Sequence, residues 1–149
     1  SMMHNDGSMV MGGEPSKIEW EDTMAMMNAM SDQTSVKWQI VDEETKMVNM
    51  HVNWKFKVGD KVKIRVVNDE KSMHPMQHPI HFHGERFVVL ATNGVPNTNM
   101  VWKDTTLVQK GDTVDILLDV TNPGEWMAHC HVAEHLADGM MINFSVSKN

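Results

Sequence analysis

The sequence predicts an all-β domain, an antiparallel β-sandwich or barrel of Greek-key type with about seven to nine short strands. From about residue 35 onward, apolar and polar residues alternate with a period of two, which is typical of half-buried strands. Turn-forming Gly, Asn, Asp and Pro residues interrupt this alternation at short intervals. At 149 residues, 41% of them hydrophobic, the chain has the size of one domain with its own core.

The amino-terminal part of the chain has a different composition. Eight of the 16 methionines fall in residues 1–30, so we predict a Met-rich leader over 1–34 and the β domain over 35–149. Within the leader, "IEWEDTMAMMNAM" places Trp20, Met24 and Met27 at i, i+4 and i+7, which predicts a short helix with one apolar stripe. A second interpretation stays open, because thioethers are soft ligands that suit Cu(I).

Two segments of the β domain show the strand pattern best. In "KVKIRVV" (61–67) aliphatic residues alternate with Lys and Arg, and in "TVDILLDV" (113–120) four aliphatic residues face one way while Asp115 and Asp119 face the other. Turns are predicted at Gly59-Asp60, at Gly111-Asp112, and at residues 68–72, 93–97 and 122–125.

Composition argues against several classes of partner. A net charge of −7 with only 13 Lys and Arg residues disfavours nucleic acid and anionic lipid, since both need a basic surface. No apolar run approaches the roughly 18–20 residues of a membrane span. The single cysteine excludes an internal disulfide, and the first residues lack the basic start and apolar stretch of a secretory signal. We therefore expect a domain that binds neither nucleic acid nor a membrane.

Six of the nine histidines gather in two short segments, "HPIHFHG" (78–84) and "MAHCHVAEHLADGMM" (127–141). Side chains alternate faces on a strand, so "HCH" sends Cys130 one way and His129 and His131 the other. In "HFH" the same rule places His81 and His83 on one face, with the intervening Phe on the other. The sequence thus indicates two metal sites of different composition.

The first candidate site contains the cysteine. His135 and Met140 follow Cys130 at spacings of five and five, and His78, near the entrance of its strand, is the second histidine. One cysteine, two histidines and a weak axial methionine form the ligand set of a blue-copper electron-transfer site. The remaining group, His81, His83, His129 and His131, offers only imidazoles, which suit copper, zinc or iron.

Three segments, "HPIHFHGERFVVL", "WKDTTLVQKGDTVDI" and "PGEWMAHCHVAEHLADGMM", resemble the carboxy-terminal cupredoxin (plastocyanin-like) domain of the multicopper oxidases, the laccase-like family. The resemblance covers residues 35–147 and implies a cupredoxin fold and copper as the cofactor. By the family pattern, the type 1 copper ligands are His78, Cys130, His135 and the axial Met140. His81 is then a type 2 ligand, and His83, His129 and His131 are type 3 ligands.

The resemblance also implies a function and a place for it. A one-electron donor, such as a phenol or a metal ion, is oxidised at the type 1 copper. The electron passes through Cys130 to His129 and His131, and dioxygen is reduced to water at the type 2/type 3 cluster. The family further implies a periplasmic or extracellular location.

The chain departs from the family pattern in three respects. The family cluster needs eight histidines, and four come as two His-x-His pairs from an amino-terminal domain that this chain does not contain. The chain's other histidines, His4, His51 and His74, are isolated. We therefore expect an amino-terminal oxidase domain as partner. In addition, Glu85 stands where many relatives have a histidine, and Leu136 where some have an acid that helps to deliver protons.

Five residues near the candidate ligands have weaker assignments. A carboxylate can orient a metal-bound imidazole, so Glu134 could hold a ligand histidine and Asp104 could orient a type 1 histidine. We interpret Trp126, Met127 and Met141 as packing residues.

Two other functions remain to be weighed. A stand-alone blue-copper electron carrier would use only the type 1 site and would leave four histidines without a purpose. A mononuclear cupin would use "HFH", but it needs a glutamate about four residues later, where Phe87 and Val88 stand, and it leaves Cys130 unexplained. The sequence leaves the substrate and the oligomeric state open, a homo-oligomer included. We expect the surface with His81, His83, His129 and His131 to be an interface.

Overall fold

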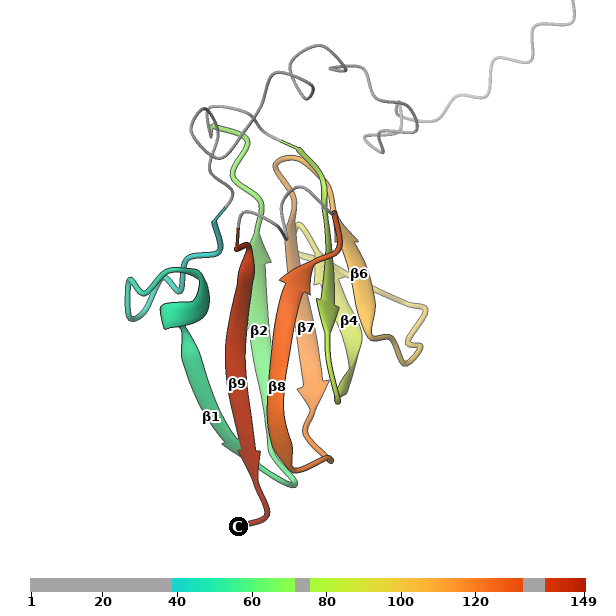
Figure 1. The fold of residues 1–149 in the computed structure, drawn as a ribbon. Coiled ribbons are helices and arrows are strands. Elements are labelled where there is room, and N and C mark those ends of the chain that lie inside the picture. Colours follow the sequence, from blue (N-terminus) through green and yellow to red (C-terminus); the bar gives the residue numbers. More distant parts are fainter. Residues whose placement is uncertain (1–38, 72–75, 133–138) are drawn as a thin grey trace, which may run out of the picture.

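The computed structural model describes residues 39–71, 76–132 and 139–149, and Figure 1 shows their arrangement. The leader, its predicted helix and the boundary at residue 34 lie outside these ranges. One short 3-10 helix, η1, spans Asn49–His51. The strands are β1 (Asn53–Lys57), β2 (Lys61–Val67), β3 (His78–Phe82), β4 (Arg86–Thr92), β5 (Val95–Pro96), β6 (Thr105–Val108), β7 (Thr113–Asp119), β8 (Gly124–Cys130) and β9 (Met141–Ser147).

The strands form two sheets, as the sequence predicted. Five strands in the order β1-β9-β8-β3-β6 make one sheet, and four in the order β2-β7-β4-β5 make the other. The described residues therefore form the all-β sandwich that the alternation indicated. Within these ranges there is no helix with the length and apolar character that a membrane crossing requires.

One pairing differs from the antiparallel arrangement that we expected. β1 pairs with β9 in parallel, from Asn53 opposite Asn143 to Lys57 opposite Ser147. The cause is the turn that follows β1, because it carries the chain from one sheet to the other instead of closing a hairpin within one sheet. In that turn the Val58 amide donates to the Ser147 carbonyl at 2.9 Å, and the Gly59 amide donates to the Val120 carbonyl at 2.9 Å.

The predicted alternation holds in both of the segments that showed it best. Along β2 exposed Lys and Arg residues alternate with half-buried aliphatic residues. Along β7 Val114, Ile116 and Leu118 are buried, and Asp115 is buried as well, because β7 lies between β2 and β4. Its carboxylate accepts hydrogen bonds from Arg65 Nε at 2.8 Å and Nη2 at 3.1 Å. A cross-strand partner thus satisfies this carboxylate.

The core lies between the two sheets and contains an aromatic cluster. The Phe82 ring is 5.7 Å from that of Phe87 and 6.0 Å from that of Phe144, measured between centroids. Each of these side chains contributes roughly 1.5–3 kcal/mol through burial. Cys130 is completely buried in the same core. The predicted soft ligand therefore occupies an apolar environment rather than the surface.

Candidate metal centre

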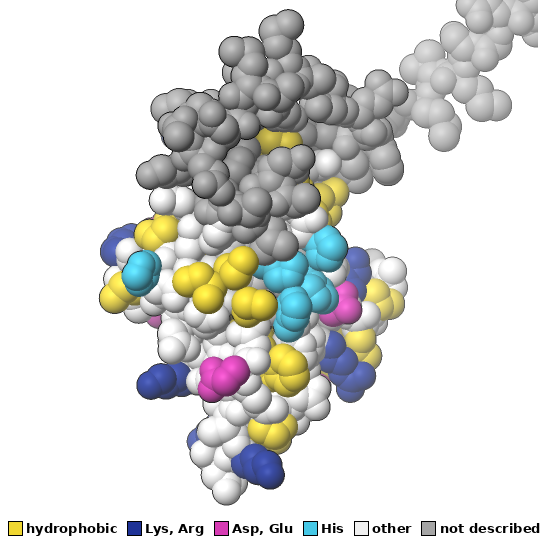
Figure 2. Space-filling model, in the orientation of Figure 1, with side chains coloured by type: hydrophobic (Ala, Val, Ile, Leu, Met, Phe, Trp, Pro, Cys, Tyr) yellow, Lys and Arg dark blue, Asp and Glu magenta, His cyan; other side chains and the backbone are white. Residues whose placement is uncertain are grey.

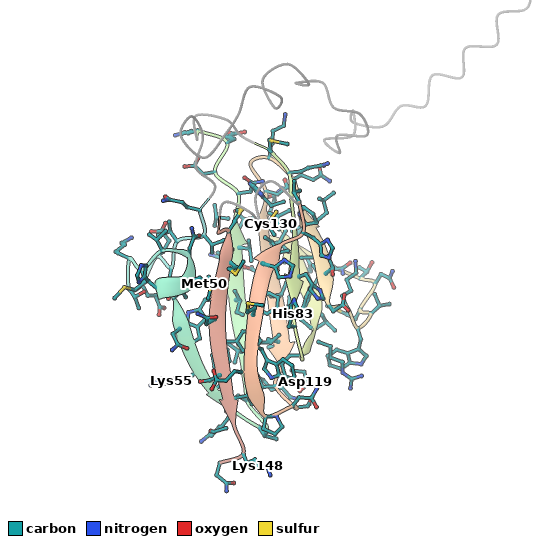
Figure 3. The ribbon with its side chains drawn as sticks, viewed as in Figure 1. Met50, Lys55, His83, Asp119, Cys130 and Lys148 are labelled. Atoms are coloured by element: carbon teal, nitrogen blue, oxygen red, sulfur yellow. The ribbon has the colours of Figure 1, made fainter. Side chains whose placement is uncertain are left out.

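Strands β3 and β8 lie side by side and bring the two histidine segments together. In the antiparallel register, Ile80 lies opposite Cys130 and His81 lies opposite His129. Ile80 and Cys130 face the core, whereas His81 and His129 belong to the opposite face of the sheet. The strand geometry therefore separates the cysteine from the neighbouring histidines, as the "HCH" pattern predicted. Figure 3 places Cys130 and His83 in the half of the sandwich that lies away from Lys148.

Three of the four predicted type 1 ligands, His78, Cys130 and Met140, are buried, and the fourth, His135, lies outside the described residues. The Sγ of Cys130 is 3.5 Å from Nδ1 of His78. The Cys130 amide donates to the Met140 carbonyl at 3.2 Å, and the Met140 side chain is buried. A sulfur and a nitrogen at about 2.3 and 2.0 Å from one metal ion, at a tetrahedral angle, would be about 3.5 Å apart. The Cys130 sulfur and the His78 nitrogen therefore fit a shared metal ion.

Burial also determines the protonation of the cysteine. It raises the pKa of the Cys130 thiol to about 11. The thiol is therefore neutral at pH 7, and only the thiolate is a strong metal ligand. A soft cation that reaches Cys130 has to displace this proton.

The imidazole group, which we define as His81, His83, His129 and His131, lies on the outer face of the five-stranded sheet. Ring centroids are 4.8 Å apart for His81 and His83, 4.9 Å for His83 and His129, and 5.6 Å for His129 and His131. Figure 2 shows histidine side chains gathered on one face of the molecule. A polar pocket lined in part by His81 and His83 opens beside the group, so solvent can reach it.

Hydrogen bonds fix the tautomers of two of these rings. The Nδ1 of His129 lies 2.9 Å from the Cys130 carbonyl, which can only accept, so His129 carries its proton on Nδ1. The lone pair of His129 is therefore on Nε2, and it accepts from Nε2 of His83 at 2.8 Å. Two nitrogens at about 2.0 Å from one metal ion, at a right angle, would be about 2.8 Å apart. The pair therefore fits a metal ion in place of the shared proton.

His81 is oriented in a similar way from the neighbouring strand β6. Its Nδ1 lies 3.0 Å from the Asp104 carbonyl and 2.9 Å from the Thr105 hydroxyl. Donation to that carbonyl leaves Nε2 of His81 as the nitrogen with the lone pair. Sequence reasoning missed Thr105, because only the register of β3 on β6 places it opposite His81.

The structure does not place Asp104 at His78, one of the two predicted type 1 histidines, and the other, His135, lies outside the described residues. The carboxylate of Asp104 lies 3.7 Å from Nδ1 of His81, a predicted type 2 ligand, and it accepts from the Thr105 hydroxyl at 2.9 Å. The physical reason is the register, which pairs the start of β6 with the end of β3 rather than with His78 at its beginning.

The environment of His83 favours the neutral form of its ring. Burial, followed by the charges of His81, His129 and His131, lowers the pKa of His83. Neutral imidazole is the form that binds metals. Within the described ranges, no three His, Cys, Asp or Glu side chains converge on one metal position.

The remaining predicted residues have mixed outcomes. Trp126 packs against the core and Met141 is half-buried, which agrees with their interpretation as packing residues. The same interpretation is wrong for Met127, whose side chain is 37% exposed. Met127 shares the outer face of β8 with His129. Glu134 and Leu136 lie outside the described residues. Glu85 is only 5% exposed, and its carboxylate accepts from the backbone amides of Thr121 and Asn122.

Comparison with known proteins gives a consistent result. A family model described as "Multicopper oxidase" matches residues 16–149. A multicopper oxidase of Staphylococcus aureus is 30% identical over 129 residues, which cover 85% of this chain and 28% of that protein. A multi-copper oxidase from Pediococcus acidilactici has a similar structure, with a TM-score of 0.59, 33% identity, and coverage of 65% of this chain and 21% of the other.

A second solved structure supports the same assignment. The multicopper oxidase from Aquifex aeolicus matches with a TM-score of 0.54 and 37% identity, over 63% of this chain and 21% of that chain. The chain therefore spans less than a third of the length of these relatives. The copper-type ligand chemistry, the two-sheet fold and the matching family model agree, and the chain belongs to the multicopper oxidase family.

Proposed function

We propose that this chain is the cupredoxin domain that accepts electrons in a multicopper oxidase. In this proposal His78, Cys130, His135 and Met140 hold a type 1 copper. His81 contributes to a type 2 site, and His83, His129 and His131 contribute to a type 3 site. The observation that carries the proposal is the placement of Cys130 on one face of β8 and of its neighbour His129 on the other.

Copper, when bound, supplies one-electron redox chemistry at both sites. The chain itself supplies the connection between them, because Cys130 is joined by one peptide link to His129 and by another to His131. A hydrogen bond from Nδ1 of His129 to the Cys130 carbonyl adds a second connection. The buried core excludes water from Cys130, and the tautomer of His129 places its lone pair on Nε2, toward His83. In this role Cys130, His129 and His131 form the path of the electron.

The whole protein's activity belongs to the same proposal. A one-electron donor would be oxidised at the type 1 site, and dioxygen would be reduced to water at the other. An amino-terminal oxidase domain would supply the missing His-x-His pairs and cover the imidazole group. The short span of this chain relative to its relatives supports such a partner. By analogy with the family, we propose a periplasmic or extracellular location.

The stand-alone electron carrier is the weaker candidate. It requires only the site around Cys130, yet the structure brings four further histidines together, and hydrogen bonds orient three of them. Multicopper oxidase relatives support the oxidase assignment.

Visible absorption during titration with Cu(II) tests the proposal. We expect an intense blue band in the wild-type chain, from thiolate-to-copper charge transfer, and no such band in Cys130→Ser. His51→Ala, which removes a histidine outside both sites, is the control and should keep the band. A blue band that persists in Cys130→Ser, or a folded wild-type chain that binds Cu(II) without colour, would contradict the type 1 assignment.

A further inference from the structure

His83 lies one residue beyond the end of strand β3, which carries His81. The paired register of β3 and β8 ends at Phe82, opposite Ala128. The His83 amide still donates to the Met127 carbonyl at 2.8 Å, and the chain then turns at Gly84, whose φ is +75°. The position of the His83 ring therefore depends on what holds this turn.

The turn is held by a buried carboxylate. Glu85 accepts from the Thr121 amide at 2.7 Å and from its hydroxyl at 3.3 Å. It also accepts from the Asn122 amide at 2.9 Å through one carboxylate oxygen and at 3.2 Å through the other. Both backbone donors belong to the loop that enters β8. Glu85 thus ties the turn after His83 to the strand that carries His129.

Two further contacts close the arrangement. The Asn122 side chain donates to the Gly84 carbonyl, and Nε1 of Trp126 donates to the Asn122 carbonyl at 3.1 Å. The Trp126 ring fills the space where a Cβ at Gly84 would lie, only 2.3 Å from that position. We call Gly84, Glu85, Thr121, Asn122 and Trp126 the Glu85 network.

We propose that Glu85 is a positioning residue for the imidazole group, and that the Glu85 network holds His83 in contact with His129. The inference rests on the proposed function for its use, whereas the contact between the two rings is an observation of the structure. His83 follows β3, and His129 lies on β8. Their 2.8 Å Nε2–Nε2 contact therefore requires the end of β3 to keep a fixed position relative to β8. The turn at Gly84 and the loop at Asn122 are the points where the Glu85 network sets that offset.

The carboxylate of Glu85 matches the number of donors at this site. A neutral imidazole, which has one acceptor nitrogen, cannot accept from two neighbouring backbone amides at once. A carboxylate has two acceptor oxygens and satisfies both amides.

The first test uses the full chain without metal. Nuclear Overhauser cross-peaks between the ring protons of His83 and His129 report their contact. We expect these cross-peaks in the wild type and their loss in Glu85→Ala, with the β fold retained by circular dichroism. Asp60→Ala is the matched control, since it removes a carboxylate that accepts from the Lys57 amide in the β1–β2 turn. This control should keep the cross-peaks.

Glu85→Gln keeps one acceptor oxygen and provides the comparison should Glu85→Ala fail to fold. Weakened cross-peaks in Glu85→Gln support the proposal. Cross-peaks of wild-type strength in folded Glu85→Ala or in Glu85→Gln would overturn it, because Glu85 would then serve only stability.

The second test measures Cu(II) binding by the imidazole group in a Cys130→Ser background, where the thiolate site is absent. Adding Glu85→Ala should weaken this binding by about 10- to 100-fold, the range found for groups that orient metal ligands. Equal Cu(II) affinity with and without Glu85→Ala would count against the proposal. If the Cys130→Ser chain binds no Cu(II), the proposal that the imidazole group binds metal fails. The cross-peaks measured without metal still decide whether Glu85 positions His83.

Discussion

Replacement of Gly84 by alanine tests how tightly the turn after His83 is packed. The residue has a φ of +75°, and an added Cβ would lie 2.3 Å from two atoms of the Trp126 ring. Gly94 provides a matched control, because its φ is +77° and nothing lies within 4 Å of its added Cβ. The two substitutions share the backbone strain and differ in the steric clash.

The magnitudes follow from these two contributions. An L-residue in the left-handed region costs roughly 1–2 kcal/mol, and both variants should lose this much stability. Overpacking costs about 1–3 kcal/mol more, and only Gly84→Ala should show it. We therefore expect Gly84→Ala to lower the free energy of unfolding by about 2–5 kcal/mol and Gly94→Ala by about 1–2 kcal/mol.

Urea unfolding followed by circular dichroism measures both values. Trp126→Leu removes the indole ring that an added Cβ at Gly84 would meet. In that background the loss of unfolding free energy caused by Gly84→Ala should therefore fall to the loss caused by Gly94→Ala. Equal losses for Gly84→Ala and Gly94→Ala in the wild-type background would refute the reasoning, since they would mean that Trp126 moves aside freely.

Two other predictions follow from described contacts. The hydrogen bond from Arg65 lowers the pKa of Asp115 below its ordinary value of 3.8. The ionised carboxylate therefore stabilises the fold at any pH above 3.8, and this stabilisation is lost as the pH falls through the lower pKa of the folded state. Asp115→Asn should thus lower the Tm at pH 7 and change it less at pH about 3; an equal loss at both values would contradict this. Met140→Leu should keep the blue band of the Cu(II)-loaded chain and raise its reduction potential, because a weak axial donor tunes the site without defining it. Voltammetry of the loaded chain checks this, and an unchanged potential would show that the Met140 thioether does not contact the metal.

Local periodicity explains why so much of the fold could be predicted. Alternation is a property of a single strand, so "KVKIRVV" and "HCH" revealed their two faces without knowledge of any neighbour. The same rule would have placed Met127 on the outer face, since it lies two residues before His129. Our packing interpretation ignored that parity.

The contacts between strands could not be predicted in the same way. The hydrogen bond between His81 and Thr105 depends on the register of β3 on β6, and the bonds of Glu85 depend on the approach of a loop 36 residues away. The parallel pairing of β1 with β9 joins opposite ends of the domain. Sequence spacing contains no information about such offsets, so these features had to come from the structure.

The opposite orientation of Cys130 and His129 on β8 has a consequence for how this domain can change its length in evolution. Insertion or deletion of one residue between Gly124 and Cys130 would reverse the facing of every later side chain in the strand. The thiol would turn to the surface and an imidazole would enter the core, so both centres would be lost in one event. Substitutions can alter the centres one at a time, but changes of length in β8 cannot. At Gly94, by contrast, an added Cβ would meet nothing within 4 Å, so a side chain introduced there would leave both centres intact.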